Sequence, residues 1–331
     1  MASSCLWRGK RVLVTGGTGF IGANLLRRLL AEGAHVSALI RHAESAWRLK
    51  SILHEIDILP GDISRPEDVE NAVTASRPGV IFHLATARSI EAVENLPLFI
   101  STNVLGASNL ILSAKRAGIK AVVYTGSQLE YGHSASAHVE TDRLSPYTLH
   151  GVTKAAATMS FQGVARQIGF PVVILRLFHV YGPWESPQRF IPTLIAAALK
   201  GETVAMTEKG FRRDYIYIDD VIEALLIAAR RPDLKGEVFN IASGRQVLNE
   251  EVAAIVERCI GKEIDSTCGA YAAHLTDTGF RVADIRKARS VLGWEPKVDL
   301  DSGIKATIDW LSPARNYPDR AGLISKYGLR A

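Results

Sequence analysis

Short apolar runs alternate with helical patterns through the first two thirds of the chain. The run RVLVTG (residues 11–16) predicts a buried strand, and leucines then recur at helical spacing over residues 25–30. Gly33 is expected to end that helix, because glycine readily takes the left-handed conformation of a helix C-cap. The next apolar run, HVSALIR (residues 35–41), predicts a second strand.

The same alternation continues to about residue 178. Further strands are predicted at GVIFHLA (79–85), AVVYTGS (121–127) and PVVILRLF (171–178). Helices are expected around Asn103–Ala117 and Thr153–Gln167, and SRPE (Ser64–Glu67) has the form of a capping box that opens another helix. Strands and helices in strict alternation predict an α/β fold with a parallel, doubly wound sheet that binds ligands at the carboxyl ends of its strands.

The pattern loosens after the last of these strands, although an apolar helix is still expected near Phe190–Leu199. We therefore expect residues 1–178, with 217–247 returning, to form the doubly wound domain. The remaining segments, 179–216 and 248–331, are expected to form a smaller mixed α/β domain that binds the substrate. No internal repeat or low-complexity linker separates the two parts, so we expect them to share an interface.

Charge and cysteine content narrow the classes of ligand. The net charge of +5 favours an anionic ligand, but the arginines occur as scattered pairs, which indicates a phosphate site and no nucleic-acid partner. The three cysteines lack CxxC spacing, which favours reduced thiols and implies no metal. We see no apolar run of about 18 residues, so we expect a cytoplasmic protein with no membrane partner.

The segment TGGTGFIG (Thr15–Gly22) follows the first predicted strand and opens the first helix. In this spacing Gly16 permits a sharp turn, Gly19 lets a diphosphate approach the backbone, and Gly22 lets helix and strand pack closely. Because strand, glycines and helix agree, the segment predicts dinucleotide binding and identifies the first domain as a Rossmann domain.

The end of the second strand bears on the choice of cofactor. An acidic residue there usually binds the ribose 2'-hydroxyl of NAD, but this strand ends in Leu39-Ile40-Arg41-His42. The Arg41 guanidinium suits a 2'-phosphate, which favours NADP with NAD as the alternative, unless Arg41 is only a surface charge. Asp62 is expected either to contact the adenine or to stabilise a turn.

Beyond these features, the chain resembles the extended short-chain dehydrogenases/reductases, the group of nucleotide-sugar epimerases, reductases and dehydratases. The resemblance covers nearly the whole sequence. It rests on TGGTGFIG, HLA (83–85), NVLGASNL (103–110), TGSQLEYG (125–132), LRLFHVYGP (175–183), RRDYIYIDDV (212–221), FNIASG (239–244) and VADIRKARSVLGWEP (282–296). It implies a homodimer that acts on a nucleotide-sugar.

The resemblance also implies roles for individual residues. Ser127 matches the catalytic serine, which binds the reacting oxygen of the sugar, and Lys154 matches the lysine that holds the nicotinamide ribose. Arg213 matches an arginine that binds the substrate diphosphate, and Arg281 either joins it or lies on the surface. The expected cofactor contacts are Gly16, Gly19, Phe20, Ile21, Gly22, Arg41, Asp62, Ile63, Leu84, Ala85 and Lys154. The expected substrate contacts are Arg88, His179, Arg189, Arg213 and Arg281.

The main departure from the family pattern is His150, which occupies the place of the catalytic tyrosine four residues before Lys154. Tyr147 lies two helical turns before the lysine, so it cannot take the place of the catalytic tyrosine. Histidine has a reference pKa near 6.5, and an adjacent ammonium favours its neutral form, so His150 is a competent proton carrier. The alternatives are a structural or engineered histidine, or another acid such as Tyr131.

Two further departures narrow the reaction. His179 replaces a usual asparagine, and we expect its one N–H to reach the substrate. Gln128 and Leu129 replace the Asp-Glu pair of the dehydratases, which argues against a 4,6-dehydratase. The preferred interpretation is C4 keto reduction or C4 epimerisation by hydride transfer. A non-redox lyase or isomerase, a cofactor-binding sensor and a non-sugar ketone as substrate are the alternatives.

Overall fold

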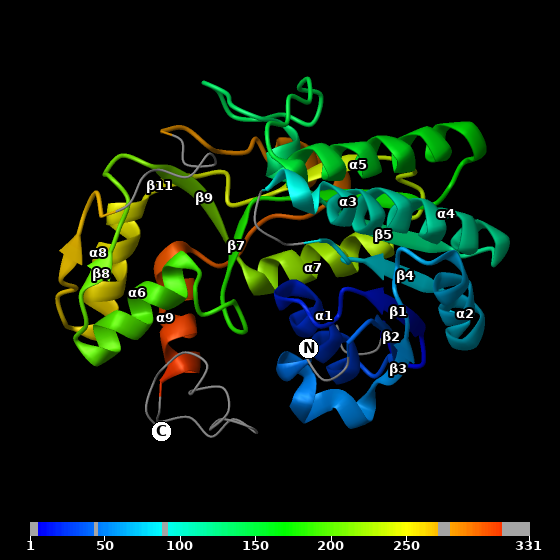
Figure 1. Cartoon of the computed structure of the whole chain (residues 1–331), viewed down its shortest axis with the longest axis horizontal. Coiled ribbons are helices and arrows are strands. Elements are labelled where there is room, and N and C mark those ends of the chain that lie inside the picture. The colour runs from blue at the N-terminus through cyan, green and yellow to red at the C-terminus, as the bar shows by residue number, and fades with distance from the viewer. Residues whose placement is uncertain (1–5, 43–45, 88–91, 271–278, 313–331) are drawn as a thin grey trace.

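A seven-stranded parallel sheet forms the centre of the computed structural model, which describes residues 6–42, 46–87, 92–270 and 279–312 (Figure 1). Its order is β10-β6-β5-β4-β1-β2-β3. The strands are β1 (Arg11–Thr15), β2 (His35–Ile40), β3 (Asp57–Pro60), β4 (Val80–His83), β5 (Ala121–Ser127), β6 (Val172–Leu177) and β10 (Val238–Ile241). The chain runs outward from β1 in one direction and then, from β4, in the other. The predicted doubly wound fold is confirmed.

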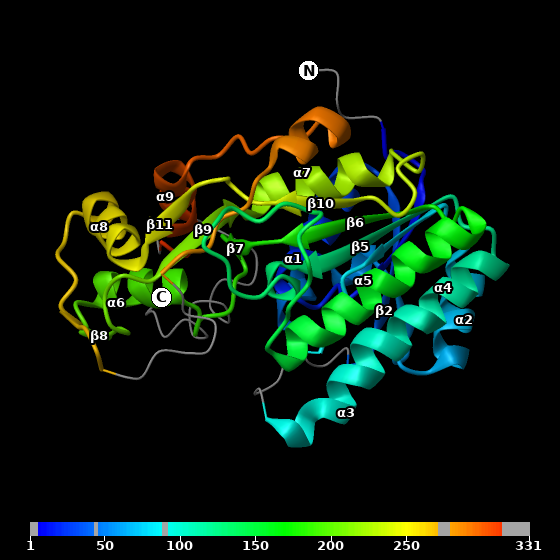
Figure 2. The same cartoon turned by 90° about the horizontal axis from the view of Figure 1, so that it is seen from above.

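Helices cover both faces of this sheet, as Figure 2 shows. One face carries α1 (Phe20–Ala31) and α7 (Ile218–Ala229); the other carries α2 (Pro66–Ser76), α4 (Gly106–Arg116) and α5 (Leu149–Ile168). Side chains of β1 alternate between the faces, because Val12 and Val14 pack with α1 whereas Leu13 packs with α2 and α4. Each fully buried leucine in these layers stabilises the fold by about 1.5–3 kcal/mol.

Two helical segments differ from their predicted form. The helix α2 begins at Pro66 after Arg65, because the Ser64 hydroxyl donates to Asp62 instead of forming the predicted capping box. The segments η3 (Val93–Asn95), α3 (Leu96–Phe99) and η4 (Ile100–Leu105) continue into α4 as one helical run. Among the described residues, Val93–Arg116 is long and apolar enough to cross a membrane by length and composition alone, which we had not expected, and 44% of its most apolar window is buried.

A smaller lobe lies beside the carboxyl ends of the main sheet (Figure 1). Its strands are β7 (His179–Tyr181), β9 (Arg212–Tyr217) and β11 (Gln246–Leu248) in one sheet, and β8 (Val204–Ala205) and β12 (Ser266–Thr267) in another. Its helices are α6 (Phe190–Lys200), α8 (Asn249–Ile260) and α9 (Leu300–Leu311), whereas η6 (Ala288–Leu292) packs against β10 of the main sheet. The chain leaves the main sheet after β6 and returns to it with α7 and β10.

Arg48, in η2 (Trp47–Glu55), joins the smaller lobe to the glycine-rich loop. Its guanidinium donates to the carbonyl of Trp184 (2.7 Å), to Ser186 Oγ (3.0 Å) and to the carbonyl of Thr18 (3.4 Å). Trp184 has a positive φ of 72°, a conformation that costs about 1–3 kcal/mol in a residue other than glycine. The Arg48 contacts therefore hold a strained loop at the boundary of the two parts.

Candidate active site

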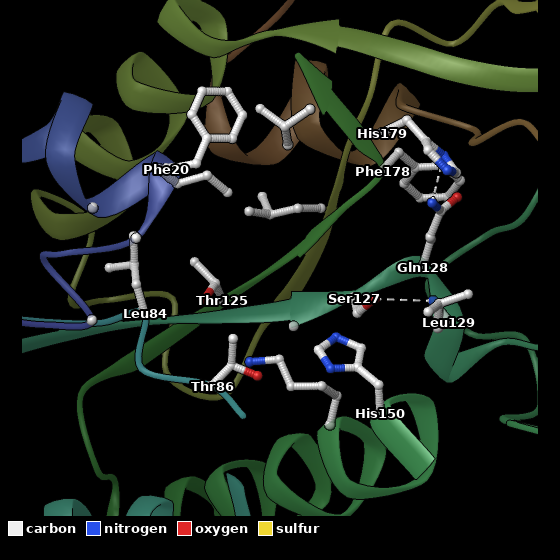
Figure 3. A pocket seen from close by; sticks show the side chains of 18 of the residues that line it. Phe20, Leu84, Thr86, Thr125, Ser127, Gln128, Leu129, His150, Phe178 and His179 are labelled. Atoms are coloured by element: carbon white, nitrogen blue, oxygen red, sulfur yellow. Dashed lines mark hydrogen bonds between the residues drawn. The ribbon is translucent and has the colours of Figure 1, made fainter. Parts of the chain in front are cut away.

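A cavity of about 560 Å³ opens at the carboxyl ends of the strands, beside the point between β1 and β4 where the strand order reverses (Figure 3). Many of the predicted site residues line it: Gly16, Gly19, Phe20, Ile21, Gly22, Leu84, Ser127, His150, Lys154, His179, Arg189 and Arg281. The residues Arg41, Asp62, Ile63, Ala85 and Arg213 are not part of this lining, and Arg88 lies outside the described residues. Most of the site residues predicted from the sequence therefore line one cavity.

The glycine-rich loop forms a cradle that only glycine permits. A Cβ on Gly16, whose φ is 77°, would lie 2.5 Å from the backbone nitrogen of Ala85. A Cβ on Gly22 would lie 2.3 Å from the carbonyl oxygen of Gly16. Gly19 is the N-cap of α1 and supplies no side-chain cap, so the first N–H groups of the helix face the cavity side. This geometry fits a dinucleotide diphosphate.

Arg41 and Asp62 form an ion pair at the ends of β2 and β3. The Arg41 side chain is 52% exposed, and its Nη1 lies 3.5 Å from Asp62 Oδ2. The other oxygen of Asp62 accepts from the backbone N–H and the hydroxyl of Ser64. Although partial burial works against it, these bonds and the Arg41 charge lower the pKa of Asp62. These bonds to Ser64 fit the predicted turn role of Asp62, and its contact with the adenine stays a prediction.

Ile63 and Ala85 support the cofactor side of the site from behind the lining. Ile63 is buried, and its side chain lies 3.0 Å from where a Cβ on Gly106 would stand. The Ala85 N–H faces the hydroxyl of Thr15 at 3.3 Å. These contacts fix the loop after β3 to α4 and the loop after β4 to β1.

Ser127 ends β5 at the cavity and is held by a capping box. Its Oγ accepts from the backbone N–H of Leu129 (3.2 Å), and its own N–H donates to Glu130 Oε1 (2.8 Å). Since Oγ is the acceptor in the first bond, the hydroxyl proton is left to donate to a ligand in the cavity. The carboxylate of Glu130 in turn accepts from Nε of Arg176 (2.7 Å). Sequence analysis missed this buried pair.

His150 approaches Ser127 from the first turn of α5, and Figure 3 shows its ring directed towards the serine. The helix begins with Thr148 as N-cap, whose Oγ1 accepts from the N–H of Gly151 (2.9 Å). A Cβ on Gly151 would lie only 2.4 Å from the carbonyl oxygen of Leu129, so glycine lets this helix approach the end of β5. The ring of His150 meets that of Phe99 edge-on, with centroids 6.4 Å apart.

Lys154 lies one helical turn after His150 and is only 3% exposed. Burial lowers its pKa to about 8, while the charge of Glu130 acts in the opposite direction. Its Nζ lies 4.5 Å from the centroid of the Tyr124 ring, a cation–π contact that offsets part of the desolvation cost. The buried His83 stays neutral beneath it, because burial and the Lys154 charge lower the pKa of His83 to about 3.

Asn103 fixes the region around Lys154 and was not singled out from the sequence. It lies in η4, where the helix widens into a π turn. Its Oδ1 accepts from the N–H of Ala87 (2.7 Å), and its Nδ2 donates to Thr153 Oγ1 (2.9 Å). The residue therefore ties the loop after β4 to the helix that carries Lys154. A mid-helix asparagine gives no signal of such contacts in one sequence.

His179 has both ring nitrogens occupied by protein groups. Its Nδ1 lies 2.7 Å from the side-chain amide of Gln128, a contact drawn in Figure 3, and its Nε2 lies 3.1 Å from Nη1 of Arg213. Burial, together with Arg213 and two further arginines, holds the pKa of His179 well below its usual value. The expected free N–H towards a substrate is therefore corrected, since each nitrogen already has a partner.

The far end of the cavity carries two of the predicted arginines. Arg281 is 3% exposed and donates through Nη2 to the Tyr147 hydroxyl (2.9 Å), so it is not a surface residue. Arg189 lies 3.6 Å from Glu185, a lining carboxylate that sequence analysis missed. The Tyr147 ring stacks on His133, with centroids 4.2 Å apart. The cations suit an anionic substrate group.

Tyr131, the alternative acid, does not serve the cavity. It is 2% exposed, its hydroxyl donates to Asn240 Oδ1 (2.7 Å) and it accepts from Nη1 of Arg176 (2.9 Å). Burial also raises the pKa of Tyr131, which disfavours loss of its proton. Of the two candidate acids, His150 lines the cavity and Tyr131 does not.

The fold and the cavity together define a dinucleotide-dependent enzyme. The sequence profile described as "NAD dependent epimerase/dehydratase family" matches residues 12–242. The chain is 30% identical over 307 residues to the low-salt glycan biosynthesis protein Agl12 of Haloferax volcanii, which covers 90% of this chain and 97% of that protein. This chain therefore belongs to the NAD dependent epimerase/dehydratase family, as the sequence resemblance predicted.

Solved structures agree with this assignment. MoeE5 in complex with UDP-glucose and NAD has a TM-score of 0.81 at 31% identity and covers 91% of this chain and 98% of its own. The UDP-glucose 4-epimerase of Thermus thermophilus, in complex with NAD, has a TM-score of 0.82 at 28% identity. The match covers 92% of this chain and 100% of the epimerase chain. The role of His150 at the tyrosine position stays a prediction.

Proposed function

We propose that the protein reduces a 4-keto group, or epimerises C4, on a nucleotide-activated sugar with a nicotinamide cofactor. The observation that carries the proposal is the meeting of Ser127, His150 and Lys154 with the glycine cradle at one cavity. Family membership and the UDP-sugar and NAD complexes of its structural neighbours support the same reaction class. The arginines at the far end of the cavity suit the diphosphate of such a substrate.

Each of the three residues has a separate role in the proposed reaction. When bound, the nicotinamide supplies or takes up the hydride. Ser127 donates its hydroxyl proton to the reacting oxygen and polarises the C–O bond. His150, directed towards Ser127, gives or removes the proton that accompanies each hydride transfer, and Lys154 holds the nicotinamide ribose. In a reduction the hydride reaches carbon and the proton reaches oxygen, so the keto group becomes an alcohol.

We further propose NADP as the preferred cofactor, with NAD as the alternative. The support is Arg41, whose half-exposed guanidinium stands at the end of β2, where a ribose 2'-phosphate is expected. Against this stands the NAD in the neighbouring structures. We also propose residues 1–178 with 217–247 as the cofactor domain and 179–216 with 248–331 as the substrate domain; the return of β10 to the main sheet supports this division.

A cytoplasmic homodimer completes the proposal. Exposed apolar side chains gather on the helical run 93–116 and on α5, which lie side by side in Figure 2. They are Val93, Leu98, Ile100, Leu105, Leu112, Val152, Met159 and Ile168. A second copy of the same surface would remove them from water, as in an isologous interface.

The test combines released ligands with turnover. Mass spectrometry identifies the cofactor that the purified protein carries, and a panel of UDP-, GDP-, CDP- and dTDP-linked sugars and 4-keto-sugars is then assayed with NADPH and NADH. His150→Phe removes the proton carrier, whereas His150→Tyr restores a phenol. Turnover by the wild type and its loss in His150→Phe are the expected results.

Other outcomes oppose the proposal. Turnover only in His150→Tyr would show that the natural chain has left redox chemistry. Stoichiometric cofactor binding with no turnover in any of the three proteins would favour a sensor. Conversion of a substrate with loss of a group and no transient reduced cofactor would favour a lyase.

A further inference from the structure

Three side chains from separate elements form a continuous hydrogen-bonded row, in which Gln128 and His179 line the cavity and Arg213 lies behind the lining. Gln128 follows Ser127 directly, His179 begins β7, and Arg213 lies in β9. The Gln128 amide and His179 Nδ1 are 2.7 Å apart, and Arg213 Nη1 and His179 Nε2 are 3.1 Å apart. The row therefore links the end of the cavity that holds the reactive serine to an arginine of the smaller lobe.

The chemistry of Arg213 fixes the proton on His179. A guanidinium only donates hydrogen bonds, so Nε2 of His179 must be the acceptor. The neutral ring then carries its proton on Nδ1, and the Gln128 atom that faces Nδ1 must be the carbonyl oxygen Oε1. A protonated His179 would place an N–H against the guanidinium, which the surrounding positive charges oppose.

We infer that His179 is a positioning residue, which as a neutral Nδ1–H ring orients Gln128 beside Ser127 and aims Arg213 at the anionic end of the substrate. This inference rests on the proposed function. A neutral imidazole orients a guanidinium and leaves its positive charge intact, whereas a carboxylate partner would neutralise that charge. The substrate group that Arg213 is suited to bind is a diphosphate.

Two amide variants distinguish the two hydrogen bonds of His179. The oxygen of glutamine reaches about as far as Nε2 of histidine, and the amide nitrogen of asparagine about as far as Nδ1. His179→Gln therefore keeps an acceptor for Arg213, whereas His179→Asn keeps a donor for Gln128. We expect His179→Asn to weaken the binding of a nucleoside diphosphate about tenfold, and His179→Gln to leave it within about threefold of the wild type.

The binding probe is whichever of UDP, dTDP, GDP and CDP the full-length wild type binds most tightly, measured by calorimetry. Arg213→Ala serves as the reference, and adding His179→Asn to it should cause no further loss if the two residues act together. Equal affinities in the two amide variants, or additive losses in the double variant, would overturn the inference.

Nuclear magnetic resonance tests the proton assignment without any turnover. In protein labelled with ¹⁵N-histidine, the signal that disappears in His179→Gln belongs to His179. We expect a protonated Nδ1 and an unprotonated Nε2 that stay unchanged between about pH 6 and pH 8. An Nε2–H tautomer would overturn the inference. The nucleoside diphosphate affinity and the His179 tautomer are both measured without turnover. A failure of the proposed reaction would therefore leave these two results unchanged and can be told apart from a failure of this inference.

Discussion

The backbone N–H of Ser127 donates to one oxygen of Glu130 over 2.8 Å, while Nε of Arg176 donates to the other over 2.7 Å. The side chains of Glu130 and Arg176 are 0% and 3% exposed. The serine that faces the substrate thus depends on a buried ion pair at the end of β5. Burying such a pair is costly, and breaking it leaves an uncompensated charge.

Glu130→Ala should therefore lower the free energy of unfolding by about 3–5 kcal/mol, because it leaves Arg176 charged and buried. Chemical denaturation measures the change. Glu70→Ala is the matched control, since Glu70 pairs with Arg116 at 2.9 Å but the two side chains are 54% and 62% exposed. That exposed pair should contribute less than about 1 kcal/mol. Equal losses in the two variants would contradict the role given to burial.

The buried Lys154 predicts a pH-dependent stability. Its pKa of about 8 in the fold lies below the usual value of 10.5, so the unfolded chain holds the extra proton between these two values. Stability should rise with pH across that window, because the folded state no longer pays for a buried charge. Below it, Lys154→Met should be more stable than the wild type by about 3 kcal/mol.

This gain should shrink as the pH rises from about 8 towards 10, which denaturation at a series of pH values measures. Lys115→Met, which removes an exposed lysine on α4, is the control. A constant gain at all pH values would mean that shape, and not charge, causes the effect. A loss of stability in Lys154→Met would show that the ammonium is better solvated than its burial indicates.

Much of the main sheet was predictable because its strands are continuous apolar runs. β5 was predicted to the residue, and β1, β2, β4 and β6 to within one or two. The short β3 was missed because its four residues are only partly buried and carry no apolar run. The π turn η4 was also missed, and its Asn103 donates to Thr153, which lies 50 positions further along the chain.

The candidate site shows the same division between local and distant causes. The glycine cradle, Ser127 and Lys154 lie in short motifs, and these reach the cavity. Glu130, Arg48 and Asn103 act through residues 46, 136 and 50 positions away, so spacing gives no sign of them. His179 lines the cavity, but its sequence position gives no sign of the two partners that occupy its nitrogens.

Gly22→Ala should abolish the tight packing at the start of α1, because its Cβ would lie 2.3 Å from the Gly16 carbonyl oxygen. We expect cofactor affinity to fall at least tenfold, measured by calorimetry with NADPH and NADH. Gly163→Ala, on the exposed face of α5, has no atom within 4 Å of the new Cβ. It should stabilise the protein by about 0.5–1 kcal/mol and leave cofactor binding unchanged. An unchanged cofactor affinity in Gly22→Ala would show that the diphosphate does not bind at this loop.

The proposed dimer predicts that charge on the exposed helical surface separates the subunits. Leu105 and Leu112 are 51% and 49% exposed, and replacing both with lysine should convert a dimer to a monomer in light scattering with size-exclusion chromatography. Val291→Lys, at a 40% exposed position on η6, should leave the dimer unchanged. A monomeric wild type, or a variant that stays dimeric, would place the interface elsewhere.

Arg41 gives the sharpest test of the cofactor. An arginine–phosphate contact is a charge-assisted, bidentate bond, so Arg41→Ala should weaken NADPH binding by about tenfold or more and leave NADH binding nearly unchanged. Asp62→Asn is the complementary variant, because it removes the carboxylate that lies 3.5 Å from Arg41 and should raise the preference for NADPH. If Arg41→Ala lowers both affinities equally, the guanidinium acts on a part common to both cofactors. If it lowers neither, Arg41 is only a surface charge, and the preference for NADP loses its support.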